Sequence, residues 1–550
     1  MNILGVSGAF GHDAAASLVV NGMTVVACEE ERFTRNKRAI REAASHSVQA
    51  CLDSAGLSMA DIDCIAVGWD PLLGPGDRRL GDSLRLLKAS APWTEGTLPD
   101  IEYVPHHRAH AALGFHTSGF DSAAVIVVDG QGEDVGSTIF RGEGSELTEI
   151  QRFGIADSLG FFYAVVTKYL GFSPGSAGKT MGLAPFGEIT YDFPELIADG
   201  DGYRVQMAGS DKPERMIGWF RRLTEVFGPA ARNLHGMDRS TGLLRSPAEL
   251  EAHHRNAAAS AQSALERLLV HLAARALRLT DSTNLVLSGG VALNCSANGL
   301  LRRTLTAGQG LFVHGAAHDG GTALGAALAV AAEAGELPAP SRTRDLFLGA
   351  HFETGTAVDF ARRLGLVVRE PNAGVAESAA RRLAASEVGA WFRGRAEYGP
   401  RALGGRSIIA RSDDREVATR VNRIKGRELW RPLAPAMLTS SADSLGIAGD
   451  GLDFMVEARW PSAGDGTGPL KGIVHVDNSV RPLVVHDEKH PFHAVLSAVQ
   501  EVAGAGTITN TSFNVEAEPM VNSPVDALRT FVTSGLDFLV LDDMLINKPA

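Results

Sequence analysis

The chain has 550 residues, several times the length of a typical domain, so we expect at least two separate cores. Hydrophobic residues make up 45% of the chain and charged residues 21%, which excludes a disordered or fibrous protein. The formal net charge of −12 argues against a surface built to bind nucleic acid but permits local basic pockets. The four cysteines form no CxxC pair, so neither a disulfide framework nor a thiolate zinc site is expected.

The first residues, MNILGVSGAF, place no basic stretch ahead of an apolar core. No window of the chain approaches the roughly 20 apolar residues that are needed to cross a bilayer. The few, scattered cysteines fit a reducing compartment. We therefore expect a protein of the cytoplasm that does not enter the membrane.

The N-terminal part of the chain alternates apolar runs with polar loops. Strands are predicted at 2–6 and 17–20, and Asn21-Gly22 predicts a hairpin turn into a strand at 23–28. The same order returns further along, with a strand at 123–128, an acid-bearing loop at 129–134 and strands at 137–140 and 147–153. An internal duplication explains this economically. The pattern is typical of the duplicated ribonuclease-H-like core of actin, sugar kinases and heat-shock chaperones.

Helices and strands continue to alternate after this repeat. The predicted elements are a helix at 257–280, strands at 284–287 and 311–313, and a helix at 322–332. Prolines at 338 and 340 end the last helix, so we place the domain boundary near 350 and divide the chain into domains 1–350 and 351–550. In the second domain we expect a helix at 376–385, a strand at 388–392 and a helix at 524–533.

His106 and His110 are the clearest chemical signal in the first domain. Residues four apart on a helix lie about 40° apart around its axis, so both imidazoles can bind one metal, whereas His107 points elsewhere. Histidines that cap or pack a surface helix are the alternative. Asp129 and Asp319 favour the metal, because each follows a predicted strand beside glycine. Two imidazoles with carboxylates suit iron, manganese or zinc better than calcium.

Glycine turns in the first domain are weaker signals. Ser288, Gly289 and Gly290 follow a predicted strand, where exposed amides can hold an oxyanion, although most such turns are only turns. The segment 175–182 contains Gly-Lys-Thr, but Ser173 stands where a P-loop needs its first glycine. We therefore reject a P-loop and expect a loop that lines the nucleotide cleft between the two halves of the duplicated core.

Basic residues concentrate in the second domain. Residues 393–431 contain eleven lysines and arginines against five acids. The stretch 411–423 is typical of a solvated helical face, but glycine and proline shape a loop around Arg401 and Arg406. Guanidinium groups match phosphate oxygens in pairs, so this loop predicts a phosphate pocket. A nucleic-acid groove is less favoured, because aromatic residues are not interleaved with the cations.

Eight motifs follow one another along the chain: GHDAAASLVVNG with EEERFTRNKR, HHRAHAALGF, GLAPFG, LSGGVALNCSANG, HDGGTALGAAL, EYGPRALGGRSI, RPLAPAML and NTSFNVEAEPMVNSPVDAL. Together they resemble the O-carbamoyltransferases of nodulation-factor and antibiotic biosynthesis over nearly the whole chain. The resemblance implies an α/β protein. Its N-terminal domain would be duplicated and actin-like, similar to the tRNA threonylcarbamoyl transferase subunit, and its C-terminal domain a YrdC-like twisted α/β domain.

The resemblance also implies a reaction at two sites. ATP and carbamoyl phosphate would form carbamoyl adenylate in the C-terminal domain. The carbamoyl group would then pass to an acceptor hydroxyl in the N-terminal domain. Adenylation gives the sluggish donor carbamoyl phosphate a better leaving group, and a histidine with an ordinary pKa of roughly 6.5 can accept the hydroxyl proton at cytoplasmic pH.

The same resemblance assigns roles to individual residues. His106, His110, Asp129 and Asp319 would bind Fe²⁺ or a similar divalent metal, and His12 and Lys37 would be catalytic beside it. We also expect Asp13 and Asp70 to contact the acceptor, Asp70 because it begins a segment, 70–100, that lacks the family motifs. Asn256 stands where the family pattern has an acid. The residues expected to contact ATP with Mg²⁺, carbamoyl phosphate or the adenylate are Gly130, Ser288, Gly289, Gly290, Arg401, Arg406, Lys425, Arg431, Arg481, Asn510 and Ser512.

Two other functions stay open from the sequence. An actin-fold small-molecule kinase would explain Asp129 and the glycine turns, but it leaves the arginine-rich half without a role. A nucleotide-binding regulator or tRNA-modification scaffold predicts nucleic-acid binding, which the acidic balance disfavours. We expect ATP, carbamoyl phosphate and a hydroxylated small molecule as partners, with no nucleic acid, no membrane and a possible homo-oligomer. The sequence does not name the acceptor.

Overall fold

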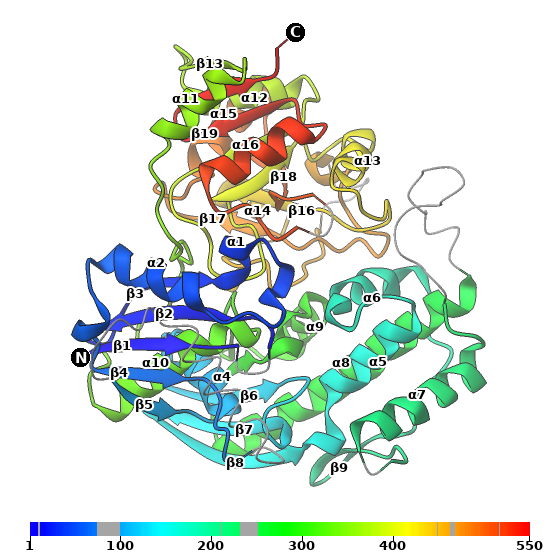
Figure 1. The fold of residues 1–550 in the computed structure, drawn as a ribbon. Coiled ribbons are helices and arrows are strands. Elements are labelled where there is room, and N and C mark those ends of the chain that lie inside the picture. Colours follow the sequence, from blue (N-terminus) through cyan, green and yellow to red (C-terminus); the bar gives the residue numbers. More distant parts are fainter. Residues whose placement is uncertain are drawn as a thin grey trace. The chain divides into compact units, whose positions relative to one another are not determined.

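The structure is a computed structural model that describes residues 1–8, 11–73, 99–209, 211–231, 251–447, 449–462, 468–515 and 518–549. These residues divide into two compact units. The first comprises the described residues of 1–34 and 38–344, and the second those of 35–37 and 345–549. The colours of Figure 1 run from blue to green along the first unit and on to red along the second. The chain passes from the first unit to the second at Asp345, and the sequence predicts a domain boundary near 350.

Within its described residues, the first unit holds two five-stranded sheets of the same topology (Figure 1). The first sheet has the order β3-β2-β1-β4-β5 and the second the order β8-β7-β6-β11-β12. In each sheet three antiparallel strands come first in the sequence, and two later strands join in parallel beside the first. The duplication that the sequence predicts is therefore present in the fold.

The strands of these sheets are β1 (Asn2–Val6), β2 (Ala15–Val20), β3 (Met23–Glu29), β4 (Cys64–Val67), β5 (Asp100–Tyr103), β6 (Ser122–Val128), β7 (Val135–Glu143), β8 (Glu146–Gly154), β11 (Asn284–Ser288) and β12 (Gly310–Val313). A separate hairpin pairs β9 (Leu196–Asp199) with β10 (Gly202–Val205). The hairpin predicted at Asn21-Gly22 is confirmed. Both of its residues have positive φ, 48° and 73°, as a tight two-residue turn between twisted strands requires.

The helices of the first unit are α1 (Glu30–Thr34), α2 (Ser45–Ala55), α4 (His106–His116), α5 (Leu159–Tyr169), α6 (Ala177–Leu183), α7 (Lys212–Phe227), α8 (Ala252–Thr280), α9 (Cys295–Thr304) and α10 (Thr322–Glu333). α4 follows the last strand of the first sheet, and α10 follows the last strand of the second. These two equivalent helices pack closely, since a Cβ on Gly325 would lie 2.0 Å from the carbonyl oxygen of Ala109.

The second unit is built on a mixed sheet of eight described strands in the order β13-β20-β19-β14-β15-β18-β16-β17. Its strands are β13 (Val367–Arg369), β14 (Gly389–Phe392), β15 (Arg406–Ala410), β16 (Ala434–Leu438), β17 (Leu483–Val485), β18 (Thr507–Ser512), β19 (Phe538–Leu541) and β20 (Met544–Asn547). The helices are α11 (Gly355–Arg363), α12 (Val375–Ala384), α13 (Arg415–Ile424), α14 (Thr439–Ser444), α15 (His493–Ala503) and α16 (Pro524–Thr533). The elements predicted at 376–385, 388–392 and 524–533 are confirmed as α12, β14 and α16.

The core of the second unit is apolar and continuous. Phe392, Phe531 and Leu539 are among its fully buried side chains, and they come from β14, α16 and β19. Burial of this size stabilises a domain without cross-links. The four cysteines of the chain all lie in the first unit, where they are buried and are not joined in disulfides.

Candidate functional site

The two histidines expected to bind a metal lie side by side at the start of α4. Their Nε2 atoms are 3.1 Å apart, and their side chains are buried, with exposed fractions of 3% and 0%. The four-residue spacing puts His106 and His110 on one face of the helix. His107 turns away, as expected, and its Nδ1 lies 2.8 Å from Thr138 Oγ1.

Two carboxylates complete this cluster. Asp129 follows β6, and its Oδ2 lies 3.4 Å from His106 Nε2. Asp319 opens a short 3-10 helix before α10, and its Oδ1 lies 3.9 Å from the Nε2 atoms of both His106 and His110. One ligand atom from each of the four residues lies within 4.8 Å of the others. The structure thus brings together the four residues that the sequence singled out.

The duplicated fold explains why these residues meet. The loop after β1 carries His12, and the equivalent loop after β6 carries Asp129. α4 begins at His106, while Asp319 lies just before the equivalent helix, α10. His12 and Asp129 follow the equivalent strands β1 and β6. His106 and Asp319 stand at the starts of the equivalent helices α4 and α10. These two pairs of residues therefore surround one point.

The donor atoms of the cluster fit a divalent metal. His106 Nδ1 lies 3.1 Å from the carbonyl oxygen of Gly68, to which it can donate, so that Nε2 keeps its lone pair for a metal. The Gly290 amide donates to Asp129 Oδ1 at 2.9 Å, which leaves Oδ2 facing the histidines. Two imidazoles and two carboxylates form a ligand set that suits iron, manganese or zinc.

The electrostatics of the cluster are those of a site prepared for a cation. Burial opposes a charge on His106, but the hydrogen bond to Asp129 and the charge of Asp319 prevail and raise its pKa to about 9. Burial lowers the pKa of His110, and the charge of His106 lowers it further. Burial raises the pKa of Asp319, and the charge of Asp129 adds to this effect. A bound cation would offset the repulsion between the negative charges of Asp129 and Asp319.

His12 belongs to a charged group beside this cluster. Its Nδ1 lies 3.0 Å from Asp13 Oδ2 and 3.6 Å from Asp319 Oδ2. Arg38 donates to both carboxylate oxygens of Asp13 and lies 3.2 Å from His12 Nδ1. Burial lowers the pKa of His12, but the hydrogen bond to Asp13 and the charge of Asp319 outweigh it, so the pKa is raised. Asp13, expected to contact the acceptor, is here a partner of His12 and Arg38.

Lys37, the other expected catalytic residue, is placed differently from His12. By its contacts it belongs to the second unit, where its charge contributes to lowering the pKa of Lys425. The basic side chain beside His12 is instead Arg38, its neighbour in sequence. The sequence alone did not single out Arg38.

Asp70 and Glu133 border the metal cluster from another side. Asp70, an expected acceptor contact, uses Oδ1 to accept the Leu72 amide at 2.9 Å, and the adjacent Trp69 lines a cavity of about 10 Å³ together with His12 and Asp319. Glu133 Oε1 accepts the backbone amides of both Asp70 and His106, at 2.9 Å and 2.8 Å. Glu133 therefore fixes the start of α4. Sequence reasoning missed it, although it shares the 129–134 loop with Asp129.

The glycine turns hold this cluster in place. Gly289 has φ 89°, and a Cβ there would lie 2.4 Å from the carbonyl oxygen of Val128, so only glycine fits. Ser288 is fully buried at the end of β11. The Gly290 amide is used by Asp129, and the carbonyl of Gly130 accepts Ser158 Oγ at 2.9 Å. In this structure the turns support Asp129, and the direct ligand contacts expected from the sequence stay a prediction.

The predicted phosphate-binding residues gather at one edge of the sheet in the second unit. β18 runs antiparallel to both β15 and β16, and β17 is parallel to β16. The end of β18 therefore meets the starts of the other three strands. The residues at this edge are Arg401 before β15, Lys425 and Arg431 before β16, Arg481 before β17, and Asn510 and Ser512 on β18.

The loop that carries Arg401 is built around a buried acid. Glu397 Oε1 accepts three backbone amides, from Leu403, Gly405 and Arg406, at 2.7, 2.8 and 3.1 Å. Asn510 Nδ2 donates to the carbonyl oxygen of Ala402 at 2.8 Å and so ties the loop to β18. Glu397 was not singled out from the sequence. Its role follows from the turn that glycine and proline impose on the loop.

Three arginines lie near one another at this edge of the sheet. Burial and the charges of Arg431 and Arg481 lower the pKa of Arg427, and burial with Arg481 lowers that of Arg431. Glu428 is the nearby acid, with Oε2 at 4.0 Å from Arg431 Nη1. Arg427 Nη2 and Arg481 Nε are buried without a hydrogen-bond partner among the described residues. Buried donor atoms without partners, together with an excess of positive charge, suit an anion.

Lys425 holds Ser512 in place. Its Nζ donates to Ser512 Oγ at 3.2 Å, to Asn514 Oδ1 at 2.9 Å and to the Asn514 carbonyl at 3.0 Å. Because these acceptors use its donors, Lys425 orients the loop after β18.

Arg406, another expected ligand contact, lies in the interior of the second unit. Its side chain is fully buried and donates to the carbonyl oxygens of Arg393, Gly405 and Asn522. Its guanidinium carbon also lies 3.5 Å from the ring centre of Phe392. The sheet interior therefore uses this guanidinium, and its expected ligand contact stays a prediction. The sequence could not separate it from Arg401, since both flank the same glycine-rich loop.

Family models match both parts of this chain. The model described as carbamoyltransferase N-terminus matches residues 2–73 and 85–328, and the model described as carbamoyltransferase C-terminus matches 380–548. The chain belongs to the carbamoyltransferase family. The resemblance seen in the sequence is thereby confirmed, and the protein is a carbamoyltransferase enzyme.

Relatives of this carbamoyltransferase include proteins named for nodulation. The nodulation protein NolNO of Sinorhizobium fredii is 34% identical over 100% of this chain and 80% of its own length. The nodulation protein NolO of Bradyrhizobium diazoefficiens is 35% identical over 80% of this chain and 78% of its own. Both alignments extend across the two units described above.

Among solved structures, full-length HypF in a phosphate- and nucleotide-bound form is similar with a TM-score of 0.37 and 15% identity, over 62% of this chain and 56% of that one. A ROK hexokinase from Thermus thermophilus is similar with a TM-score of 0.31 and 18% identity, over 60% and 98%. Within the described ranges of the carbamoyltransferase, none of the helices has the length and apolar character of a membrane span.

Proposed function

We propose that this carbamoyltransferase makes carbamoyl adenylate from ATP and carbamoyl phosphate and transfers the carbamoyl group to a hydroxyl of a small acceptor. The observation that carries the proposal is the presence of two polar sites of opposite character. One is an acid- and imidazole-lined cation site in the first unit, and the other is a guanidinium-lined anion site in the second. We extend the proposal to a YrdC-like fold for the second unit.

The activation step belongs to the guanidinium site. Carbamoyl phosphate loses its phosphate to water and gives carbamate and inorganic phosphate. A carbamate oxygen then attacks the α-phosphorus of ATP, and pyrophosphate leaves with Mg²⁺. Each species carries phosphate oxygens or a carboxylate-like oxygen, which Arg401, Arg431 and Arg481 are suited to hold, while Asn510 and Ser512 offer neutral hydrogen bonds.

The transfer step belongs to the site around His12. The acceptor hydroxyl attacks the carbamoyl carbon, the bond to AMP breaks, and His12 accepts the hydroxyl proton as a general base. Asp13 and Arg38 orient the imidazole through the contacts described above. A divalent metal such as Fe²⁺, held by His106, His110, Asp129 and Asp319, would supply Lewis-acid polarisation of the carbonyl or phosphate. The sum is acceptor carbamate, AMP, pyrophosphate and phosphate.

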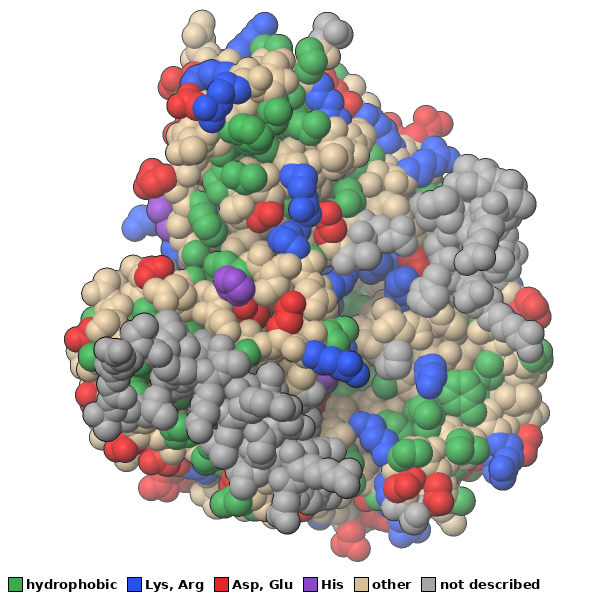
Figure 2. Space-filling view, in the orientation of Figure 1, with side chains coloured by type: hydrophobic (Ala, Val, Ile, Leu, Met, Phe, Trp, Pro, Cys, Tyr) green, Lys and Arg blue, Asp and Glu red, His purple; other side chains and the backbone are tan. Residues whose placement is uncertain are grey.

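The surface supports a small acceptor over a polyanion. Lys and Arg side chains are interspersed with Asp and Glu over the face in view (Figure 2), and the chain carries a net charge of −12. A nucleic-acid partner would be repelled by this balance. We therefore propose a hydroxylated small molecule as the acceptor, with Asp70 among its contacts. The free, buried cysteines suit the reducing cytoplasm, where we place the protein.

The products formed from ATP test this proposal against a kinase. We would incubate the protein with ATP, Mg²⁺ and carbamoyl phosphate and follow the phosphorus species by nuclear magnetic resonance. Without an acceptor, the proposal predicts pyrophosphate release that depends on carbamoyl phosphate, with AMP appearing as the adenylate hydrolyses. Formation of ADP, with a phosphoryl group on an added acceptor, would instead identify an actin-fold kinase.

A further inference from the structure

Arg35 comes from the beginning of the chain but belongs to the second unit. The segment Arg35–Lys37 groups with that unit by its contacts, although the residues on both sides of it group with the first. The guanidinium donates through Nη1 to the Met520 carbonyl at 2.6 Å and through Nη2 to the Pro519 carbonyl at 2.8 Å. An early stretch of sequence thus holds a loop near the end of the chain.

Two acidic side chains also lie close to the guanidinium of Arg35. Arg35 Nη2 lies 3.8 Å from Glu518 Oε2, and Nε lies 3.8 Å from Asp526 Oδ1. The side chain of Arg35 is only 15% exposed, so these interactions are poorly screened by water. Charge-assisted hydrogen bonds to two successive carbonyls define the position of a backbone in a way that one ion pair cannot.

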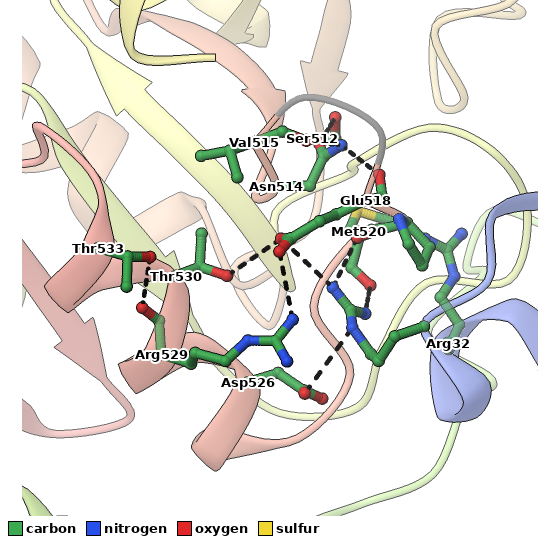
Figure 3. Close-up of polar contacts among 12 residues, drawn as sticks. Arg32, Ser512, Asn514, Val515, Glu518, Met520, Asp526, Arg529, Thr530 and Thr533 are labelled. Atoms are coloured by element: carbon green, nitrogen blue, oxygen red, sulfur yellow. Dashed lines mark hydrogen bonds and ion pairs between the residues drawn. The ribbon is translucent and has the colours of Figure 1, made fainter. Parts of the chain in front are cut away.

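Hydrogen bonds join the loop at residues 518–520 to residues of the proposed anion site. Asn514 Nδ2 donates to the Glu518 carbonyl at 2.7 Å, and Asn514 Oδ1 accepts Lys425 Nζ at 2.9 Å and Ser512 Oγ at 2.5 Å. Figure 3 shows Asn514 and Ser512 on one side of Glu518, with Asp526, Arg529 and Thr530 on the other. A continuous series of contacts therefore runs from Arg35 through residues 518–520 to Ser512 and Lys425.

The backbone of Arg35 supports a dedicated role. Its φ is 61°, in the left-handed region that side-chain-bearing residues rarely adopt. Such a conformation has an energetic cost and persists where surrounding contacts hold it. Here the holding contacts are those of the guanidinium with the 518–520 loop and Asp526.

We propose that Arg35 is a positioning residue of the anion site and fixes Ser512 and Lys425 by way of the 518–520 loop and Asn514. The proposal rests on the proposed function, in which Ser512 contacts ATP or the carbamoyl group. It also means that the activating site of the second unit is incomplete without a segment from the first forty or so residues.

Replacing Arg35 by lysine and by alanine separates the effect of its charge from the effect of its planar shape. Arg35→Lys keeps a cation for Glu518 and Asp526 but loses the planar fork that reaches two carbonyls. We expect KM for ATP in the carbamoyl-phosphate-dependent exchange of pyrophosphate into ATP to rise about tenfold in Arg35→Lys and more in Arg35→Ala. Melting temperature and iron content should stay close to those of the wild type.

Arg529→Ala is the matched control. Arg529 Nη2 also reaches Glu518, at 3.2 Å, but the side chain is 54% exposed and donates to neither carbonyl of the loop. This variant should leave KM within about twofold of the wild-type value. Asn514→Ala removes the next link, so it should raise KM as Arg35→Lys does, and combining the two should add little.

Each outcome decides the proposal. A KM in Arg35→Lys that matches Arg529→Ala overturns it, as does a fully additive double variant. So does a loss of kcat and melting temperature at unchanged KM, because that result marks general stability as the role of Arg35. If even the wild type exchanges no pyrophosphate, the proposed function fails. Calorimetric titration with ATP then still tests Arg35, with a tenfold weaker Kd expected only in its own variants and Asn514→Ala.

Discussion

At the scale of single residues, a proton and a metal would compete for Nε2 of His106. Asp129 and Asp319 overcome the effect of burial and hold the pKa of His106 near a value of about 9. A metal on Nε2 must displace that proton, because only the neutral imidazole is a ligand. The apparent affinity for Fe²⁺ should therefore rise about tenfold per pH unit below pH 9 and level off above it.

Competition with a coloured chelator between about pH 6.5 and 8.5 measures this slope. His107→Asn is a suitable control, since His107 lies beside the cluster but contacts Thr138 instead, and its variant should keep the same slope. An affinity that does not change over this range would contradict the protonated state of His106.

Residues that act directly were easier to predict than those that hold them. The i, i+4 spacing indicated His106 and His110, and glycine beside a strand end indicated Asp129. Arg38 and Glu133 were missed, because a side chain that orients a neighbour leaves no spacing rule in the sequence. Arg427 stands in a run of cations, and only the fold shows that it lies near Arg431 and Arg481.

At the scale of elements, the metal cluster depends on how closely α4 and α10 approach. A Cβ at Gly325 of α10 would lie 2.0 Å from the Ala109 carbonyl of α4, so Gly325→Ala must push the two helices apart. α4 carries His106 and His110, and Asp319 lies just before α10. We expect Fe²⁺ affinity to fall at least about tenfold and unfolding free energy by about 1–3 kcal/mol.

Metal titration and urea unfolding measure these two effects. Gly154→Ala is the matched control, because a Cβ there meets nothing within 4 Å, and its backbone, at φ −65°, suits alanine. It should change stability by no more than about 0.5 kcal/mol. Tight Fe²⁺ binding by Gly325→Ala would show that the helix spacing does not set the ligand geometry.

Elements with strong local signals were predictable, and their meeting points were not. Asn21-Gly22 fixed a hairpin, and α8 followed from its helical periodicity, although it begins at Ala252, earlier than expected. The edge where β18 meets the starts of β15, β16 and β17 depends on strand order, which no local pattern contains. Arg406 is an example, because its burial depends on the strand order and cannot be predicted from the residues around it in the sequence.

At the scale of the whole molecule, the chain combines a duplicated first unit with a second unit of different topology. The duplication supplies equivalent loops and helix starts, and from these it builds one cluster of imidazoles and carboxylates. The second unit supplies a sheet edge rich in guanidinium groups. This separation predicts that each half of the proposed reaction can be lost without the other.

The most direct test compares His110→Ala and Arg481→Ala in both half-reactions. His110→Ala should lose bound Fe²⁺ and carbamoyl transfer but still release pyrophosphate from ATP with carbamoyl phosphate. Arg481→Ala should keep Fe²⁺ and lose pyrophosphate release by at least about a hundredfold, because it opens a gap in the guanidinium cluster. If both variants stay folded yet lose metal and pyrophosphate release alike, the division of chemistry between the two units is wrong.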